Sequence, residues 1–295
     1  MSFVRTYDSA TAYRGVFRHL IGMFGYPKLV WQHRYMVQNF FRRDLLTRVN
    51  GSFLGLGWML LQPMFLFVVY YLVFGLLFRE RNAGGESDMV FALYLFSGVI
   101  VWQSFIESTS VSCSIIVDNG NLVKKVAFPS EVLFVHVVAV SMIIYLVGAF
   151  VCVMTAWISG VCAPGWLLLA MPLVLAVQFL LSLGIGLLLA NLYVFVRDIV
   201  QLWRIVSMAW MFLTPIFWEP KLLVDKLSPE AVFWIVHLNP AYPLLQAHRL
   251  ALGGTAAHLG DFWTHLGTAA LWGIGLFALG YSVFMSRKHK YADLI

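Results

Sequence analysis

The chain has 295 residues, of which 61% are hydrophobic and 12% are charged. Soluble domains carry about 25% charged residues, so this composition excludes an ordinary soluble domain. The formal net charge is +6. Its basic residues are spread over several separate segments, which favours contact with anionic lipid headgroups and argues against binding of nucleic acid. We therefore expect an integral membrane protein.

Six apolar stretches occupy most of the chain, and each is long enough to cross a bilayer core of about 30 Å as a helix. They cover residues 54–78, 89–112, 131–158, 166–196, 199–218 and 262–285. Their interiors hold two formal charges, Glu107 and Arg204. The predicted fold is all-α and integral to the membrane, with six transmembrane helices. In this prediction residues 1–53 form a cytoplasmic N-terminal segment, and residues 54–295 form one transmembrane domain.

The lysines and arginines predict the orientation. If the N-terminus is cytoplasmic, fifteen of the twenty fall in inner segments and five fall in outer segments. Cytoplasmic loops of membrane proteins carry such an excess. We expect both termini on the cytoplasmic side, as an even number of spans requires.

Residues 28–50 predict an amphipathic helix along the inner membrane surface. Val37, Phe40, Phe41 and Leu45 repeat at helical spacing, and polar or basic residues fall largely on the other side. Two interpretations are open. The segment is either a positively charged anchor or an interfacial helix that transmits movement into the first span.

The inner loop between spans two and three predicts another short surface helix. Residues 118–121 are a turn and capping signal, an amphipathic piece follows, and Pro129 ends it. Such a helix suits the docking of a cytoplasmic partner protein. A simple connecting loop is the alternative.

The outer segment 219–261 predicts two short helices. The first begins at the SPE sequence of residues 228–230, and the second begins at the NP sequence of residues 239–240 and is interrupted by Pro243. Each is too short to span the membrane. Together they suit a lid over an exit, and a passive hairpin is the alternative.

The two interior charges lie about equally far from the inner ends of their predicted spans. An unpaired charge in lipid is costly, so we expect an ion pair between Glu107 and Arg204 that braces the cytoplasmic entrance. In the alternative, Arg204 extends to the phospholipid headgroups and Glu107 pairs with the basic helix at 28–50.

Several kinds of site are absent from the sequence. It has no G-x-x-x-x-G-K-[ST] phosphate loop, no aspartate-rich magnesium cluster and no potassium-type filter. We expect no catalytic residue, no metal site and no cofactor on this chain. The energy for any transport must then come from another protein.

Five segments follow one another at matching topological positions: NGSFLGLGWMLLQP, NLVKKVAFPSEVL, VFVRDI, LTPIFW and LNPAYPLLQAHRLAL. Through them, residues 35–290 resemble the ABC-2 family of transporter permeases. Within this family the likeness is to the polysaccharide-exporting branch, which includes O-antigen and teichoic-acid exporters.

The resemblance implies a permease subunit that has no ATPase site, forms a homodimer and binds two copies of a separate ABC ATPase, where ATP and Mg²⁺ would sit. The implied cargo is an undecaprenyl-diphosphate-linked polysaccharide of the O-antigen type, exported across the bacterial inner membrane. Teichoic acid, capsular polysaccharide or a small hydrophobic molecule is the alternative cargo. Two further interpretations of the function are a membrane enzyme of glycan synthesis and a scaffold subunit that transports nothing.

The resemblance also implies three groups of site residues. The contact with the ATPase would be made by Asn119, Leu122, Val123, Lys124, Lys125, Phe128 and Pro129. The gate at the exit would include Asn239, Pro240 and Arg249. Spans one and five of both copies would line the channel, with aromatic residues Trp58, Phe65, Tyr70, Tyr71, Phe74, Trp203, Trp210, Phe212, Phe217 and Trp218.

These aromatic residues favour a carbohydrate cargo on chemical grounds as well. Aromatic residues make up 16% of the chain, and the apolar C–H faces of sugar rings stack on aromatic rings. For any one of them, the alternative is a side chain that faces lipid or belongs to the interfacial aromatic belt.

Overall fold

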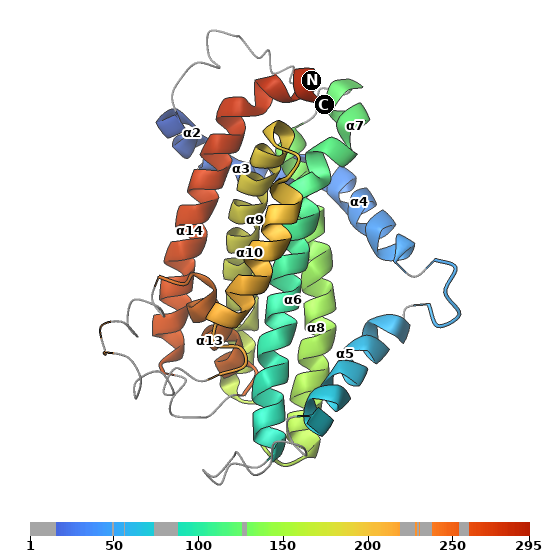
Figure 1. Ribbon diagram of the computed structural model, residues 1–295, viewed down its shortest axis with the longest axis vertical. Coiled ribbons are helices and arrows are strands. Elements are labelled where there is room, and N and C mark those ends of the chain that lie inside the picture. Colours follow the sequence, from blue (N-terminus) through green and yellow to red (C-terminus); the bar gives the residue numbers. More distant parts are fainter. Residues whose placement is uncertain are drawn as a thin grey trace.

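The computed structural model describes residues 16–48, 50–55, 57–73, 88–125, 129–218, 228, 230, 238–253 and 260–295. All regular elements in this part of the chain are helices. The all-α prediction is therefore confirmed for the residues that the structure describes, and the helices stand side by side as an elongated bundle (Figure 1).

Among the described residues, four helices are long and apolar enough to cross a membrane. They are α6 (Asp88–Asp118), α8 (Leu133–Ile158), α9 (Met171–Phe195) and α14 (Phe262–Arg287). Each lies where the sequence predicted a span. The α6 helix continues to Asp118, past the predicted end of its span at residue 112, so its C-terminal end extends toward the predicted docking helix.

The first and fifth predicted spans are shorter helices. The first is α5 (Gly57–Tyr70), and the fifth is α10 (Ile199–Leu213). After α10 the backbone turns extended at Thr214 (φ −83°, ψ 137°), because the following Pro215 disfavours a helical conformation at the residue before it. Part of the first predicted span, residues 74–78, lies outside the described residues. The count of six spans stays a prediction.

Backbone contact between α9 and α14 holds the bundle together. A Cβ atom at Gly280 would lie 2.2 Å from the carbonyl oxygen of Gly184, and one at Gly184 would lie 2.5 Å from the backbone of Leu276 and Phe277. Only glycine fits at these two positions. Because lipid tails are as apolar as the side chains, helices in a bilayer associate through such close packing of small residues.

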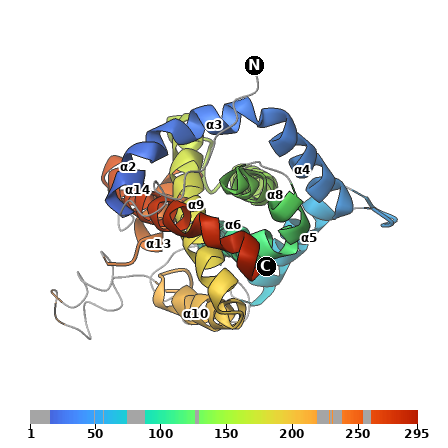
Figure 2. The same ribbon diagram turned by 90° about the horizontal axis from the view of Figure 1, so that it is seen from above.

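Three helices form an arc around the end of the bundle that carries α7 (Figure 2). They are α2 (Val16–Gly22), α3 (Tyr26–Gln32) and α4 (Arg34–Thr47). The predicted single helix at 28–50 is therefore two helices that break at His33 (φ −105°, ψ 19°). The predicted apolar face of α4 is correct, since Val37 and Phe40 pack against the bundle.

At the opposite end of the bundle, α13 (Ala241–Ala251) is buried along nearly its whole length. The predicted interruption at Pro243 is wrong. Pro243 is the third residue of this helix, where its missing N–H removes no intrahelical hydrogen bond. The other predicted outer helix lies almost entirely outside the described residues.

We expect Gly280→Ala to destabilise the protein by about 1–3 kcal/mol, the usual cost of overpacking, because the methyl group forces α9 and α14 apart. The measurement is the apparent melting temperature of the purified protein, followed by tryptophan fluorescence. Gly275→Ala is the matched control on the same helix, since a Cβ there meets nothing within 4 Å. Equal melting temperatures for the two variants would contradict the packing argument.

Candidate functional site

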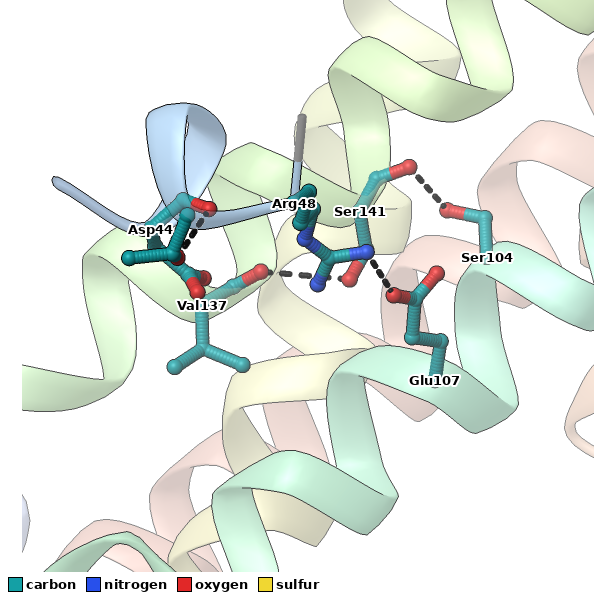
Figure 3. Close-up of polar contacts among 7 residues, drawn as sticks. Asp44, Arg48, Ser104, Glu107, Val137 and Ser141 are labelled. Carbon is teal, nitrogen blue, oxygen red and sulfur yellow. Dashed lines mark hydrogen bonds and ion pairs between the residues drawn. The ribbon is translucent and has the colours of Figure 1, made fainter. Parts of the chain in front are cut away.

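An ion pair joins the end of the interfacial helix to the bundle. Arg48 caps the C-terminus of α4, and its Nη1 atom donates to Oε1 of Glu107 on α6 (Figure 3). Each side chain is 31% exposed. The pair lies where the chain turns from α4 toward the apolar helix α5.

This contact corrects the predicted pair between Glu107 and Arg204. The two side chains form no ion pair in the structure; Arg204 is exposed on α10, and Glu107 has Arg48 as its partner, as in the alternative above. Trp210 of α10 packs edge-to-face on Phe105 of α6. Glu107 is two residues further along, about 200° around the helix. The prediction matched the depths of the two charges but took no account of the direction in which they point.

A chain of hydrogen bonds lies one helical turn from Glu107. Gln178 Nε2 on α9 donates to Ser104 Oγ on α6 (3.1 Å), and Ser104 Oγ donates to the carbonyl oxygen of Ser141 on α8 (3.0 Å). All three residues are buried. Lipid cannot replace these hydrogen bonds, so the three bonded side chains fix the positions of α6, α8 and α9 relative to one another.

Beside the ion pair, a cavity of about 520 Å³ opens between α5, α6 and α8. Its polar lining includes Arg48, Glu107, Gln62, Gln103 and Ser104. Its apolar lining includes Met59, Leu66, Ile100, Ile144 and Gly148, and the rings of Trp58, Trp102 and Tyr145 complete the wall. The Tyr145 hydroxyl lies 2.7 Å from His248 Nδ1, which ties this wall to α13.

The predicted docking helix is present as α7 (Gly120–Lys125). Asn119 starts it, and its Nδ2 atom donates to the carbonyl oxygen of Ile115 (2.8 Å). Leu122 and Val123 are half-buried and pack against the chain's own core. Lys124 is exposed, and so is Asn121, which the prediction did not include. Pro129 follows in extended conformation.

Two members of the predicted docking set are not placed by the structure. Phe128 lies outside the described residues, and so does the side chain of Lys125. The surface that α7 offers to a partner is therefore described through Asn121 and Lys124. Sequence periodicity alone did not show that Leu122 faces the bundle.

Residues that follow α14 pack against α7. The sequence analysis missed this contact. These residues form η7 (Lys288–Lys290) and α15 (Tyr291–Leu294). The Tyr291 hydroxyl donates to Asn191 Oδ1 (3.0 Å), and burial raises the pKa of Tyr291, which keeps it a neutral donor. Ile295 packs on Gly120, where a Cβ would lie 2.4 Å from Cγ2 of that isoleucine.

A buried ion pair completes this end of the bundle. Lys288 Nζ lies 2.5 Å from Oε2 of Glu131, whose side chain is fully buried in η4 (Ser130–Val132), the turn directly before α8. The Tyr26 hydroxyl of α3 donates to the backbone carbonyl of Glu131 (3.0 Å). Burial, and then the charge of Glu131, raise the pKa of Tyr26, so this hydroxyl also stays protonated. These contacts join α3, α8 and α14 just behind α7.

The aromatic residues predicted for the channel fall into two groups. Trp58 and Phe65 of α5 and Phe212 of α10 are exposed by 49%, 69% and 56%. The partly buried members that pack against the core are Tyr70, Tyr71, Trp203, Trp210 and Phe217. Trp218 is half-buried, and its Nε1 atom donates to the carbonyl oxygen of Phe212 (2.9 Å). Phe74 lies outside the described residues. Exposure does not distinguish a channel wall from a lipid-facing surface, so the lining role stays a prediction.

The predicted gate residues tie α13 to the end of α10. Arg249 is buried, and its guanidinium donates to the carbonyl oxygens of Pro215 (2.9 Å) and Ile216 (3.1 Å). It also lies over the Tyr94 ring, 3.6 Å from the centroid. A buried cation held by carbonyl oxygens and a ring face is a strong crosslink between elements.

Asn239 and Pro240 begin α13 at the same junction. The Asn239 side chain accepts from Trp210 Nε1 (2.9 Å) and donates to Thr214 Oγ1 (2.9 Å), and Pro240 is the N-terminal cap residue of the helix. The sequence placed these residues at an outer gate. The structure gives them a bracing contact with α10, and whether α13 moves stays a prediction.

The family described as ABC-2 type transporter matches residues 35–252 of this arrangement. The chain belongs to the ABC-2 type transporter family. An O-antigen export system permease protein RfbA from Myxococcus xanthus is 26% identical over 266 residues, which cover 90% of this chain and 97% of the relative. A protein of the same name from Klebsiella pneumoniae is 24% identical over 254 residues, which cover 86% of this chain and 92% of the relative.

Membership of this family makes the protein a multi-pass membrane permease of the ABC-2 type. Both relatives are named as permease proteins of an export system. The family also implies that an ABC ATPase subunit works with the chain.

We expect Arg48→Gln and Glu107→Gln to act as a unit. Each single change removes the same ion pair, worth about 0.5–1 kcal/mol at this exposure, so the double variant should melt no lower than the worse single variant. The comparison is a double-mutant cycle of apparent melting temperatures. The control is the cycle of Glu107→Gln with Arg204→Gln, in which the changes in melting temperature should be additive. Additive changes in the cycle with Arg48→Gln as well would disprove the contact.

Proposed function

We propose that this chain is the transmembrane subunit of an ATP-driven exporter that moves a lipid-linked polysaccharide of the O-antigen type across the bacterial inner membrane. The observation that carries the proposal is the likeness to two O-antigen export permeases over nearly their full lengths. The absence of a phosphate-binding loop from the sequence agrees with an ATPase on a separate subunit, which binds ATP and Mg²⁺.

In this proposal the permease is a homodimer with two copies of the ATPase. Each chain has a cytoplasmic N-terminal segment (1–53) and a transmembrane domain (54–295) with six spans, and both termini are cytoplasmic. The excess of basic residues in the inner segments supports this orientation. The interfacial helices α2–α4 and the predicted docking helix α7 lie toward the same end of the bundle (Figure 1), which supports a cytoplasmic ATPase there.

The route of the cargo runs along α5 and α10 in this proposal. Both helices leave large apolar side chains uncovered in the single chain, including Phe65 on α5 and Phe212 on α10. A second copy of the chain would turn two such faces into a channel wall. The exposed rings then offer stacking surfaces to an undecaprenyl-diphosphate-linked glycan without gripping one sugar.

Removal of the gene from its bacterial host tests the function directly. We expect the long surface polysaccharide to disappear and its lipid-linked precursor to accumulate on the cytoplasmic side, because synthesis continues without export. Antibody labelling of intact and of opened cells measures the two pools, and return of the gene should restore the surface pool. A host that keeps its surface polysaccharide would disprove this cargo.

We expect Lys124→Glu to weaken binding of the partner ATPase by at least roughly fivefold, because the change reverses an exposed charge on the docking helix. Lys290→Glu is the control, since it makes the same change in another exposed side chain near this end of the bundle. Co-purification and stimulated ATP hydrolysis are the measurements. Equal binding by both variants would show that α7 is a tether.

A further inference from the structure

The cavity beside the Arg48–Glu107 pair has charged and apolar groups at one end and is apolar at the other; Met59 on α5 and Ile106 on α6 also line the charged end. Gln62 on α5, and Glu107 and Gln103 on α6, line the end near Arg48. Further along, α5 contributes Leu66 and α6 contributes Ile100. Since α5 and α6 run in opposite directions (Figure 1), these residues follow one another in the same order along the bundle. The polar end lies where the chain turns from α4 toward α5, and Glu107 is five residues from residue 112, the predicted inner end of the second span.

The polar end carries one positive and one negative charge. Arg48 and Glu107 are each about a third exposed beside the cavity, and the hydrogen bond between them uses one of the five N–H groups of the guanidinium. The carboxylate likewise has acceptor capacity left. The two amides of Gln62 and Gln103 add further donors and acceptors.

We propose that this cavity binds one chain of a zwitterionic phospholipid whose headgroup ends in a primary ammonium. The lipid phosphate lies at Arg48, the ammonium lies at Glu107, and an acyl chain runs past Ile144 toward Leu66 and Ile100. The volume of about 520 Å³ falls within the usual range for a site that holds a single small molecule. Trp58 lines this cavity and also belongs to the aromatic residues proposed for the glycan route, but occupancy of the cavity by a phospholipid does not depend on that proposal.

The charges select this headgroup over two others. An anionic lipid, or a lipid-linked diphosphate, would bring its negative charge against Glu107, and such a like-charge contact penalises the wrong ligand. A quaternary ammonium has no N–H group to donate to the carboxylate. A primary ammonium donates three hydrogen bonds and forms a charge-assisted bond with Glu107.

The position of the lipid would have a structural consequence. The helix α5 packs on α6 and α8 beside this cavity, so a bound acyl chain fills the space beneath α5. The headgroup would also bridge Arg48 and Glu107, which connect the interfacial helix α4 to α6. The bound lipid would thereby stabilise the contact between α4 and α6.

Native mass spectrometry of the purified full-length protein tests the proposal. The protein is reconstituted in nanodiscs of phosphatidylglycerol that also contain either phosphatidylethanolamine or phosphatidylcholine. It is then released from the nanodiscs in the spectrometer, and the mass of the protein with its retained lipids is measured. We expect phosphatidylethanolamine to be retained about tenfold more than either other lipid, the difference expected for one charge-assisted hydrogen bond. Equal retention of all three lipids, or of none, would overturn the proposal.

Two neighbouring residues of α8 provide a matched pair of variants. Ile144→Trp fills the cavity, whereas Ile143→Trp changes a neighbouring side chain that is exposed and outside the cavity lining. We expect the first variant to lose the retained phosphatidylethanolamine and the second to keep it. Glu107→Gln should keep a bound lipid but lose the preference for phosphatidylethanolamine over phosphatidylglycerol. Retention by Ile144→Trp equal to that of Ile143→Trp would place the lipid elsewhere and contradict the site.

Discussion

A bilayer core offers no hydrogen bonds, and the arrangement of this permease depends on that constraint. Polar side chains between the apolar helices bond across the bundle, as Gln178 and Ser104 do. At the two ends of the bundle, buried charges bind partners within the protein: Lys288 binds Glu131, and Arg249 binds backbone carbonyl groups. The apolar surfaces between these points contribute packing but select no particular arrangement, because lipid is an equally good solvent for them. The polar contacts and the glycine contacts therefore determine which helices are neighbours.

The sequence was sufficient to predict features that depend only on the order of apolar and polar residues along the chain. Length and hydropathy located the four long helices, and helical spacing found the apolar face of α4. The sequence analysis was wrong where rotation about a helix axis mattered. Glu107 and Arg204 matched in depth, but the residues of α6 that face α10 lie on the opposite side from Glu107. The same limitation hid the inward orientation of Leu122 on α7.

Other features were missed because their signal is distributed over distant parts of the sequence. Nothing local to residues 288–295 shows that Tyr291 reaches Asn191 or that Ile295 packs on Gly120. The break at His33 has no proline or glycine to mark it, and it becomes evident only when α3 and α4 follow the curve of the bundle in Figure 2. The close approach of Gly184 and Gly280 could have been suspected from glycines in apolar stretches, but their pairing could not.

The helix α6 connects the regions that the proposed transport cycle has to coordinate. Its N-terminal end is held by Arg249, which donates to the Tyr94 carbonyl and lies over the Tyr94 ring. Further along it carries Glu107, which binds the end of α4, and its C-terminal end continues through Asn119 into α7. A single continuous helix of 31 residues transmits displacement along its axis with little loss, because its backbone hydrogen bonds would have to break before it shortens. If a partner ATPase binds α7 as proposed, we expect a displacement of α7 to move Glu107 and Tyr94 together, because one helix carries both residues. The Arg48–Glu107 pair would pass this displacement to the end of α4.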